Sequence, residues 1–139
     1  LTPVLDTLKI LKNNNIWIEV TNLLIPGQND NDIEIRDMCN WIKENLSPET
    51  PIHFSAFFPQ YKMYNTMPTP KATIQNAVSI AKKTGLTFVY AGNISINTED
   101  TFCPNCIQTV IKRERYHVSE INLNYNACKN CDHIIPGRF

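Results

Sequence analysis

Four of the five cysteines stand near the carboxyl end of the chain as two Cys-x-x-Cys pairs. The first pair is Cys103 and Cys106, and the second pair, after residues 107–127, is Cys128 and Cys131. A Cys-x-x-Cys turn directs both sulfurs to one side, and two such turns can hold a Zn²⁺ ion with four thiolates at about 2.3 Å. The spacing is therefore typical of a zinc ribbon. Because sulfur would fill all four positions, the zinc would be structural rather than catalytic.

The spacing of these cysteines is also compatible with roles other than zinc binding. Disulfides belong to oxidising compartments, and no export signal is recognisable in the sequence. A redox-active Cys-x-x-Cys is expected at a strand-to-helix junction, where neither pair falls. Four thiolates can also hold iron, as a single ion or a cluster. A Cys₃His site with His117 or His133 is conceivable, but four cysteines make a histidine ligand unnecessary.

The residue after each cysteine pair departs from the pattern of many zinc knuckles. Glycine is common there, since it adopts a left-handed backbone without strain. Here Ile107 and Asp132 occupy the two positions. The sequence therefore leaves the geometry of both turns in question.

Upstream of the cysteines, helix and strand patterns alternate. Apolar residues at helical spacing predict helices over 2–15, 31–46 and 71–85. The expected end signals are Thr2 as the cap of the first helix, Asp32 or Asn31 as the cap of the second, and Gly85 at the end of the third. Runs rich in β-branched and aromatic residues predict strands over 16–25, 52–59 and 86–92. The order αβαβαβ is typical of a parallel sheet, either open and doubly wound or part of a βα barrel. Cys39 falls on the apolar stripe of the second helix beside Met38 and Ile42, so we expect a core residue.

After Gly92 the sequence becomes polar and loses helical periodicity, which divides the chain into two domains. Residues 1–92 form the α/β domain, and residues 93–139 form a second module that is too small to fold without a staple. The runs "TVIKRERYHV" and "SEINLNY" predict a hairpin or small meander between the cysteine pairs.

Composition narrows the function classes. Lys+Arg and Asp+Glu number 13 each among 139 residues, so overall charge favours neither a nucleic-acid nor a membrane-surface partner. No apolar run approaches the roughly 20 residues of a membrane span. We expect a soluble, cytoplasmic protein. The opening residues read as a helix with nothing before it to pack on, which suggests a fragment of a longer protein.

Several segments together carry a resemblance to a known family. They are "IWIEVTNLLIPGQNDND", "PIHFSAFFPQYKM", "PTPKATIQNAVSIAKKTGLTFVYAGN" and the closing "CPNC…CKNC…IPGRF". The chain resembles, nearly end to end, the C-terminal half of radical S-adenosylmethionine (SAM) enzymes of the AmmeMemoRadiSam type, relatives of the pyruvate formate-lyase activating enzymes. The fold class expected is thus α/β, the C-terminal portion of a radical SAM partial (β/α) barrel followed by a small four-cysteine zinc ribbon.

The resemblance also implies an activity and its cofactors. Such enzymes hold a [4Fe-4S] cluster and SAM, cleave SAM reductively to a 5′-deoxyadenosyl radical, and abstract a hydrogen atom from a substrate, which is unknown here. Memo-like and Amme-like proteins are implied as partners. The cluster-binding Cys-x₃-Cys-x₂-Cys loop is absent from these 139 residues, as is the Gly-rich segment that contacts the SAM amino group. We therefore expect this chain alone to be inactive.

If the strands line such a barrel, alternation along them predicts which side chains face the cofactor. Polar residues on a buried strand need partners, and a lumen filled with SAM provides them. The residues expected to contact the cofactor are Glu19, Thr21, Leu23, Pro26, Gly27, His53, Ser55 and Phe57. Part of this pattern has an alternative explanation that needs no ligand. Glu19 can pair with His53, and Pro26-Gly27 can be a simple tight turn.

Two non-enzymatic functions also remain open. The ribbon can be a nucleic-acid module, with Lys112, Arg113, Arg115 and Tyr116 as phosphate and stacking contacts. Alternatively, it can be a protein-docking or dimerisation element on a non-catalytic α/β scaffold. The loop over residues 60–69, with Tyr61, Met63, Tyr64 and Met67, can be a lid or a plain crossover.

Overall fold

The structure is a computed structural model that describes residues 1–94, 96, 100–114 and 117–138. The chain divides into two compact units, Leu1–Ile96 and Asn97–Phe139. The sequence places this boundary after residue 92. Each unit is described by itself.

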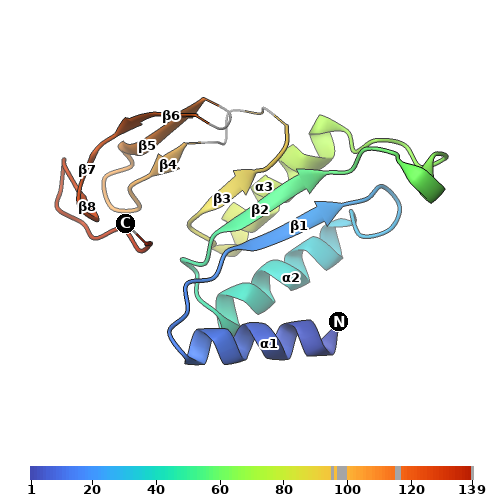
Figure 1. The fold of residues 1–139 in the computed structure, drawn as a ribbon, viewed down its shortest axis with the longest axis horizontal. Helices are drawn as coiled ribbons and strands as arrows, with labels where there is room; N and C mark the ends of the chain where they lie inside the picture. Colours follow the sequence, from blue (N-terminus) through green and yellow to red (C-terminus); the bar gives the residue numbers. More distant parts are fainter. Residues whose placement is uncertain (95, 97–99, 115–116, 139) are drawn as a thin grey trace. The chain divides into compact units, whose positions relative to one another are not determined.

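The first unit is a mixed α/β domain in which helices and strands alternate (Figure 1). Its strands form one parallel sheet in the order β1-β2-β3. The elements, in chain order, are α1 (Thr2–Asn13), β1 (Val20–Leu24), α2 (Asp32–Asn45), β2 (Ile52–Ala56), the 3₁₀ turn η1 (Tyr61–Met63), α3 (Lys71–Thr84) and β3 (Val89–Ala91). Three strands do not close a barrel, so within the described residues the unit is a sheet with helices.

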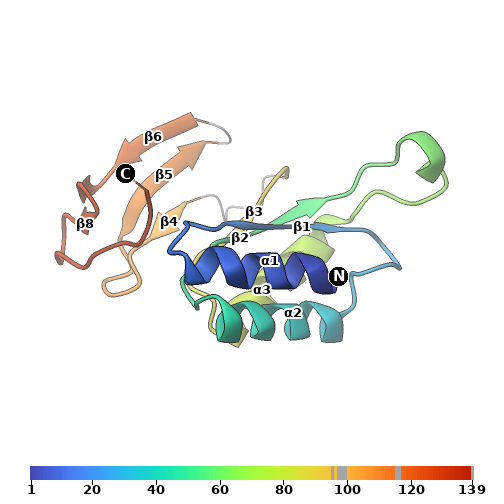
Figure 2. The same cartoon turned by 60° about the horizontal axis from the view of Figure 1, so that its bottom comes forward.

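Helices α2 and α3 lie on one side of the sheet, as Figure 2 shows. Buried and exposed residues alternate along the strands for this reason. Ile52, Phe54 and Ala56 of β2 are buried beneath α2 and α3, whereas His53 and Ser55 between them are half-buried. The other face, which we call the open face, carries Thr21, Leu23, His53, Ser55 and Tyr90. Register places Thr21 beside His53 and His53 beside Tyr90.

Local sequence signals explain most element ends. Asn31 caps α2, because its side chain accepts a hydrogen bond from the backbone N–H of Glu34 at 2.9 Å. Gly85 ends α3 in the left-handed conformation with φ 99°. The predicted cap of α1 is wrong: Thr2 is already helical, and Leu1 at the cap position contributes no side-chain bond. The strand predicted over residues 16–25 is shorter, because only Val20–Leu24 pair with β2.

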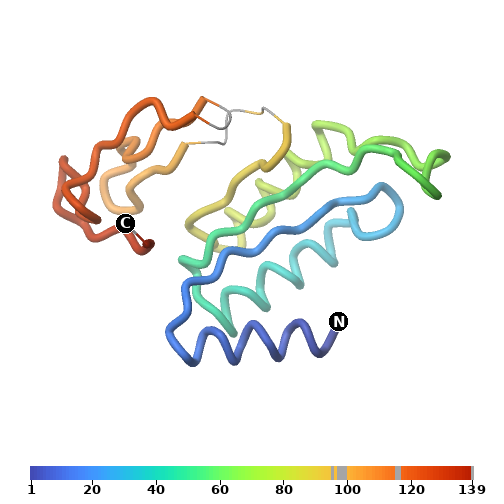
Figure 3. The backbone as a smooth tube through the Cα atoms, in the orientation of Figure 1, coloured from blue at the N-terminus to red at the C-terminus, as the bar shows by residue number. Residues whose placement is uncertain are grey.

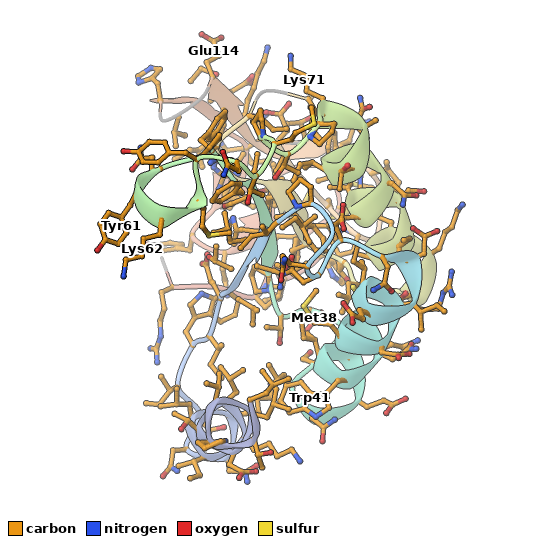
Figure 4. The ribbon with its side chains drawn as sticks, turned by 90° about the vertical axis from the view of Figure 1, so that its right-hand side faces the viewer. Met38, Trp41, Tyr61, Lys62, Lys71 and Glu114 are labelled. Carbon is orange, nitrogen blue, oxygen red and sulfur yellow. The ribbon has the colours of Figure 1, made fainter. Side chains whose placement is uncertain are left out.

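Helix α1 is the least embedded element of the first unit. None of its residues is buried, and Val4 and Ile10 remain about three-fifths exposed at 59% and 61%. It is joined to the rest through Leu8, which packs against the core, and through Lys9, whose Nζ lies 5.6 Å from the ring centre of Trp41. Figure 4 shows Trp41 of α2 lying near α1.

The second unit is built from short antiparallel strands, whose path Figure 3 traces. The predicted hairpin is present, because β5 pairs with β6 in antiparallel fashion. Its core is small, with Val110, Leu123 and Ile135 buried beside Cys103 and Cys128. The strands are β4 (Thr101–Phe102), β5 (Thr109–Glu114), β6 (His117–Ile121), β7 (Leu123–Asn124) and β8 (Ala127–Cys128).

Across the described residues, no helix combines the length and the apolar character that crossing a membrane requires.

Candidate metal centre

The four paired cysteines converge on one point of the second unit. The Sγ atoms of Cys103, Cys106, Cys128 and Cys131 all lie within 4.8 Å of one another. Two of these distances join the two turns: Cys103 to Cys131 at 3.6 Å and Cys106 to Cys128 at 3.7 Å. Tetrahedral coordination at a metal–sulfur distance of about 2.3 Å requires sulfurs about 3.8 Å apart. The donor set thus has the size and chemistry of a four-thiolate metal site.

The two turns have the same backbone hydrogen bonds. In the first, the N–H of Ile107 donates to Cys103 O at 2.9 Å, and the N–H of Cys103 donates to Gln108 O at 2.8 Å. In the second, Asp132 donates to Cys128 O at 2.9 Å, and Cys128 donates to His133 O at 2.9 Å. The site is therefore formed by two equivalent knuckles that face each other.

The residues that replace glycine still adopt the left-handed backbone. Ile107 has φ 61° and Asp132 has φ 58°. The knuckle geometry that the sequence left in question is therefore present. A left-handed conformation costs an L-residue about 1–2 kcal/mol, and a β-branched side chain such as Ile107 tolerates it poorly. Convergence of the four sulfurs is the constraint that holds Ile107 there.

The thiols of the metal-free protein differ in their readiness to ionise. Hydrogen bonding from the Gln108 backbone, and then from the Asn130 side chain, lowers the pKa of Cys106 to about 6. The Asn105 side chain, followed by the His133 backbone, lowers the pKa of Cys131. Burial instead raises the pKa of Cys103 to about 11. Cys106 and Cys131 therefore lose their protons more readily than Cys103 when a cation enters the site.

Asn105 and Asn130 form a reciprocal pair around the sulfurs. Each is the residue before the second cysteine of its own turn, and each hydrogen-bonds the less buried cysteine of the opposite turn. Sequence reasoning missed this role, although the repeated Asn-Cys dipeptide in "CPNC" and "CKNC" was its signal.

The remaining cysteine and the histidines lie outside this centre. Cys39 is fully buried in the core of the first unit, and burial raises its pKa to about 11. That placement agrees with the core residue expected. Among the described residues, the metal-ligating group consists of cysteines alone, without His117 or His133.

The residues expected to contact a cofactor spread along the open face. Glu19 and His53 come together, with 2.9 Å between Oε2 and Nε2, and the ring of His53 stacks on Tyr90 at 5.1 Å. Leu23 and Ser55 lie side by side in register, nearer the carboxyl ends of the strands. Phe57 lies beyond the end of β2 and is buried.

Pro26 and Gly27 form a turn that directly follows β1. The N–H of Gln28 donates to Ile25 O at 3.0 Å, and Gly27 has φ 72°. These features are those of a type II turn, which requires a positive φ at its third residue. A Cβ on Gly27 would meet nothing within 4 Å, so the backbone conformation alone accounts for the glycine in this structure.

Three further residues on or beside the open face were not anticipated from sequence. Trp17 donates from Nε1 to Glu19 Oε1 at 3.0 Å. Tyr90 stacks on His53. A Cβ on Gly92 would lie 2.5 Å from Ser55 Oγ, so this glycine leaves room at the carboxyl end of the face. The register of β3 against β2, which no sequence pattern specifies, brings Tyr90 and Gly92 to these positions.

The basic run of the hairpin is partly engaged within the unit. Arg113 donates from Nη1 to Thr101 Oγ1 at 2.7 Å, and Lys112 stands opposite Glu120 in the β5–β6 ladder. Arg115 and Tyr116 lie outside the described residues. The contacts of the described cations give no support to a nucleic-acid surface.

Comparison with known proteins gives a relative without an assigned activity. The uncharacterized protein MJ0808 of Methanocaldococcus jannaschii is 41% identical to this chain over 134 residues. The match covers 94% of this chain but 40% of the relative. No family model matches the sequence. The chain thus spans less than half the length of the relative that it resembles.

Proposed function

We propose that this chain is the carboxyl-terminal part of a radical SAM enzyme, with a zinc ribbon as its tail. The observation that supports the barrel most is the sheet order. In a βα barrel, strands consecutive in sequence are neighbours and the helices lie outside. A doubly wound sheet has helices on both faces and reverses its order. The order β1-β2-β3, with α2 and α3 on one side and a polar open face, fits a sector of a barrel wall.

Unsatisfied groups of the first unit support a larger sheet. Within the described residues, β1 pairs with β2 alone, and its other edge has no strand. On the same strand, Asn22 Oδ1 is buried without a hydrogen-bond partner among these residues. A buried unpaired oxygen costs about 1–3 kcal/mol, so a donor from a further element would stabilise this edge. Helix α1 has no buried residue, so its surface is a second place where a further element could pack.

The residues of this chain do not fit the radical-generating cluster. That chemistry needs an iron with open positions for SAM, whereas the four-cysteine centre fills every position with sulfur. The cluster and the electron it delivers would come from a part of the protein other than this chain. The proposed contribution of this chain is the cavity wall and contacts to SAM at the carboxyl ends of its strands, through Leu23, Pro26, Gly27 and Ser55.

SAM cleavage is the experiment that tests the enzyme. The complete protein with its cluster reduced should convert SAM to 5′-deoxyadenosine and methionine, while the 139-residue chain should not. Gly92→Ala should raise the SAM concentration needed for half-maximal cleavage about tenfold, because the added methyl group displaces Ser55 from the cofactor side of the face. Absence of 5′-deoxyadenosine from a protein with an intact, reducible cluster would reject the proposal.

The tail is proposed to hold zinc rather than iron. Four thiolates at tetrahedral spacing accept either metal, and the absence of any open position makes a structural role the natural one. Metal analysis of the chain purified without added metal should give one zinc per molecule. Less than half an equivalent, or disulfides detected by mass, would contradict this assignment. Memo-like and Amme-like partners, which the resemblance implies, are proposed on that ground alone.

A further inference from the structure

Four side chains gather beside the amino-terminal half of the open face. Glu19 is at their centre and uses both carboxylate oxygens. Trp17 Nε1 donates to Oε1 at 3.0 Å, and His53 Nε2 lies 2.9 Å from Oε2. The His53 ring stacks on Tyr90 with 5.1 Å between centroids and 24° between planes. The imidazole is therefore fixed both in its plane and in its rotation.

This arrangement decides which nitrogen of His53 faces a ligand. A carboxylate accepts hydrogen bonds only, so its contact with Nε2 places a proton on that nitrogen. In the neutral imidazole, Nδ1 is then the acceptor. Within the described part of the chain, Nδ1 has no hydrogen-bond partner. The side chain of His53 is 28% exposed, so the ring is partly accessible to solvent.

The position of the pair on the sheet separates it from the proposed cofactor contacts. Thr21, His53 and Tyr90 form one row across the strands. Leu23 and Ser55 form the next row, two residues and about 6.7 Å nearer the carboxyl ends. Ligands of parallel α/β folds bind at the carboxyl ends, so the second row is the one that a cofactor would meet. The first row lies deeper on the same face.

We propose that Trp17, Glu19, His53 and Tyr90 form a second binding site, for a small molecule that donates a hydroxyl or amino hydrogen to His53 Nδ1. Glu19 is the positioning residue that keeps this nitrogen an acceptor. The identity of the ligand as the substrate, rather than as SAM, rests on the proposed function. Glu19 and His53 are thereby assigned to the substrate, whereas the sequence alone suggested that they contact the cofactor.

Stability gives little reason for the pair. The Glu19 side chain is 50% exposed, and an ion pair or hydrogen bond so accessible to water contributes little to folding stability. An arrangement that engages both oxygens of a carboxylate and stacks the imidazole therefore does more to fix geometry than to hold the fold. A fixed acceptor on a polar face is what recognition of a donor group requires.

The first experiment uses the zinc-loaded 139-residue chain and no SAM. Nitrogen-15 NMR of the histidine rings should show His53 as the Nε2–H tautomer at a pH where the ring is neutral. Titration with 2-propanol, a probe with one hydroxyl group, should shift His53 Nδ1 about threefold more than the ring nitrogens of His117 and His133. Glu19→Gln should mix the tautomers and remove the excess shift, because an amide can donate to Nε2. An Nδ1–H tautomer in the unaltered chain, or equal shifts at all three histidines, would overturn the proposal.

The second experiment uses the complete protein and separates the two proposals. Without substrate, Glu19→Gln and His53→Phe should leave the SAM concentration for half-maximal cleavage within about twofold of the unaltered enzyme, whereas Gly92→Ala raises it about tenfold. An increase in Glu19→Gln and His53→Phe as large as that in Gly92→Ala would return both residues to the cofactor and overturn the second site. Failure of the unaltered protein to cleave SAM would reject the proposed enzyme, and the NMR result would still decide the acceptor site.

Discussion

At the scale of single residues, the two knuckles of the candidate metal centre repeat the same arrangement of side chains. Each knuckle contributes a buried cysteine, Cys103 or Cys128, and a more exposed one, Cys106 or Cys131. The Asn side chain of each turn hydrogen-bonds the more exposed sulfur of the opposite turn. Amide groups therefore hydrogen-bond two of the four sulfurs. The unfavourable feature of the arrangement is the left-handed backbone of Ile107.

Ile107→Gly should stabilise the metal-bound tail. Glycine removes a left-handed strain of about 1–2 kcal/mol at the cost of about 0.5–1 kcal/mol in backbone entropy, so the net gain is about 1 kcal/mol. Little packing is lost, because Ile107 is 69% exposed. Denaturant unfolding of the zinc-bound chain, followed by NMR signals of the β5–β6 hairpin, measures the change. Asp132→Gly is the matched control and should gain less, since Asp tolerates this conformation better than a β-branched residue. A loss of stability in Ile107→Gly would contradict the strain argument.

Asn105→Leu and Asn130→Leu should each weaken zinc binding about tenfold. Residues that hydrogen-bond the ligands of a metal typically change its affinity by about 10–100-fold when they are removed. Competition with a chromophoric chelator measures the affinity. Asn124→Leu provides the same substitution at an exposed position of β7, and its affinity should remain that of the unaltered chain. Equal affinities for all three variants would show that the amide groups do not support the sulfurs.

At the scale of elements, polar side chains close the carboxyl ends of the strands. Asn29 binds the backbone on both sides of the end of β1, accepting from Ile25 N–H and donating to Leu23 O. Asn93 does the same for β2 with both groups of Ala56. Thr69 joins the two strands through its Oγ1. These residues end the sheet and hold the loops that follow it.

Thr69→Val should destabilise the α/β unit by about 2 kcal/mol. The hydroxyl group donates to Leu24 O at 2.6 Å and accepts from Phe57 N–H at 2.8 Å, so valine leaves two buried backbone groups unpaired. Chemical denaturation followed by helical circular dichroism measures the loss. Thr66→Val, in the same loop, is the control and should change stability by less than about 0.5 kcal/mol. A difference between the variants below that size would mean that water satisfies both groups.

Element type was predictable from sequence, whereas the contacts between elements were not. Apolar periodicity identified α2 and α3, and the signals at Asn31 and Gly85 fixed their ends, because those signals act within a few residues. The predicted strand over 16–25 was too long, because pairing with β2 decides which residues are extended. The convergence of the four cysteines followed from spacing, since each knuckle is local. Tyr90, Gly92 and the Asn105–Asn130 exchange depend on register and facing turns, which no local pattern encodes.

The conformation of the loop between β2 and α3 was likewise not predictable from local sequence patterns. Its ends are joined by Phe57 and Thr69, and its tip at η1 carries Tyr61, which is 72% exposed, beside Lys62 (Figure 4). Tyr61 has φ 52°, a backbone conformation that composition did not foretell. The aromatic residues that suggested either a lid or a crossover are thus solvent-exposed in this structure. Their exposure leaves both interpretations as hypotheses.

At the scale of the whole molecule, the two units draw stability from different sources. The first unit buries a continuous apolar core between its sheet and helices, with Phe54, Ile35 and Ile74 completely or almost completely buried. Among the described residues of the second unit, the buried apolar side chains besides two cysteines are Val110, Leu123 and Ile135. A core of that size does not offset the backbone entropy of the module, so we expect a metal to supply the difference.

Removing the metal should therefore unfold one unit and leave the other. Zinc binding to a four-ligand module contributes on the order of 10 kcal/mol to its folding, more than its few buried side chains provide. With excess chelator, hydrogen exchange should become fast at Val110 and Leu123 and stay slow at Ile35 and Phe54, while the helical circular dichroism persists. Replacing Cys103, Cys106, Cys128 or Cys131 by Ser should reproduce this pattern without chelator, and Cys39→Ser should not, because Cys39 belongs to the first unit. Loss of protection at Ile35 together with Val110 would show that the metal stabilises the chain as a single cooperative body.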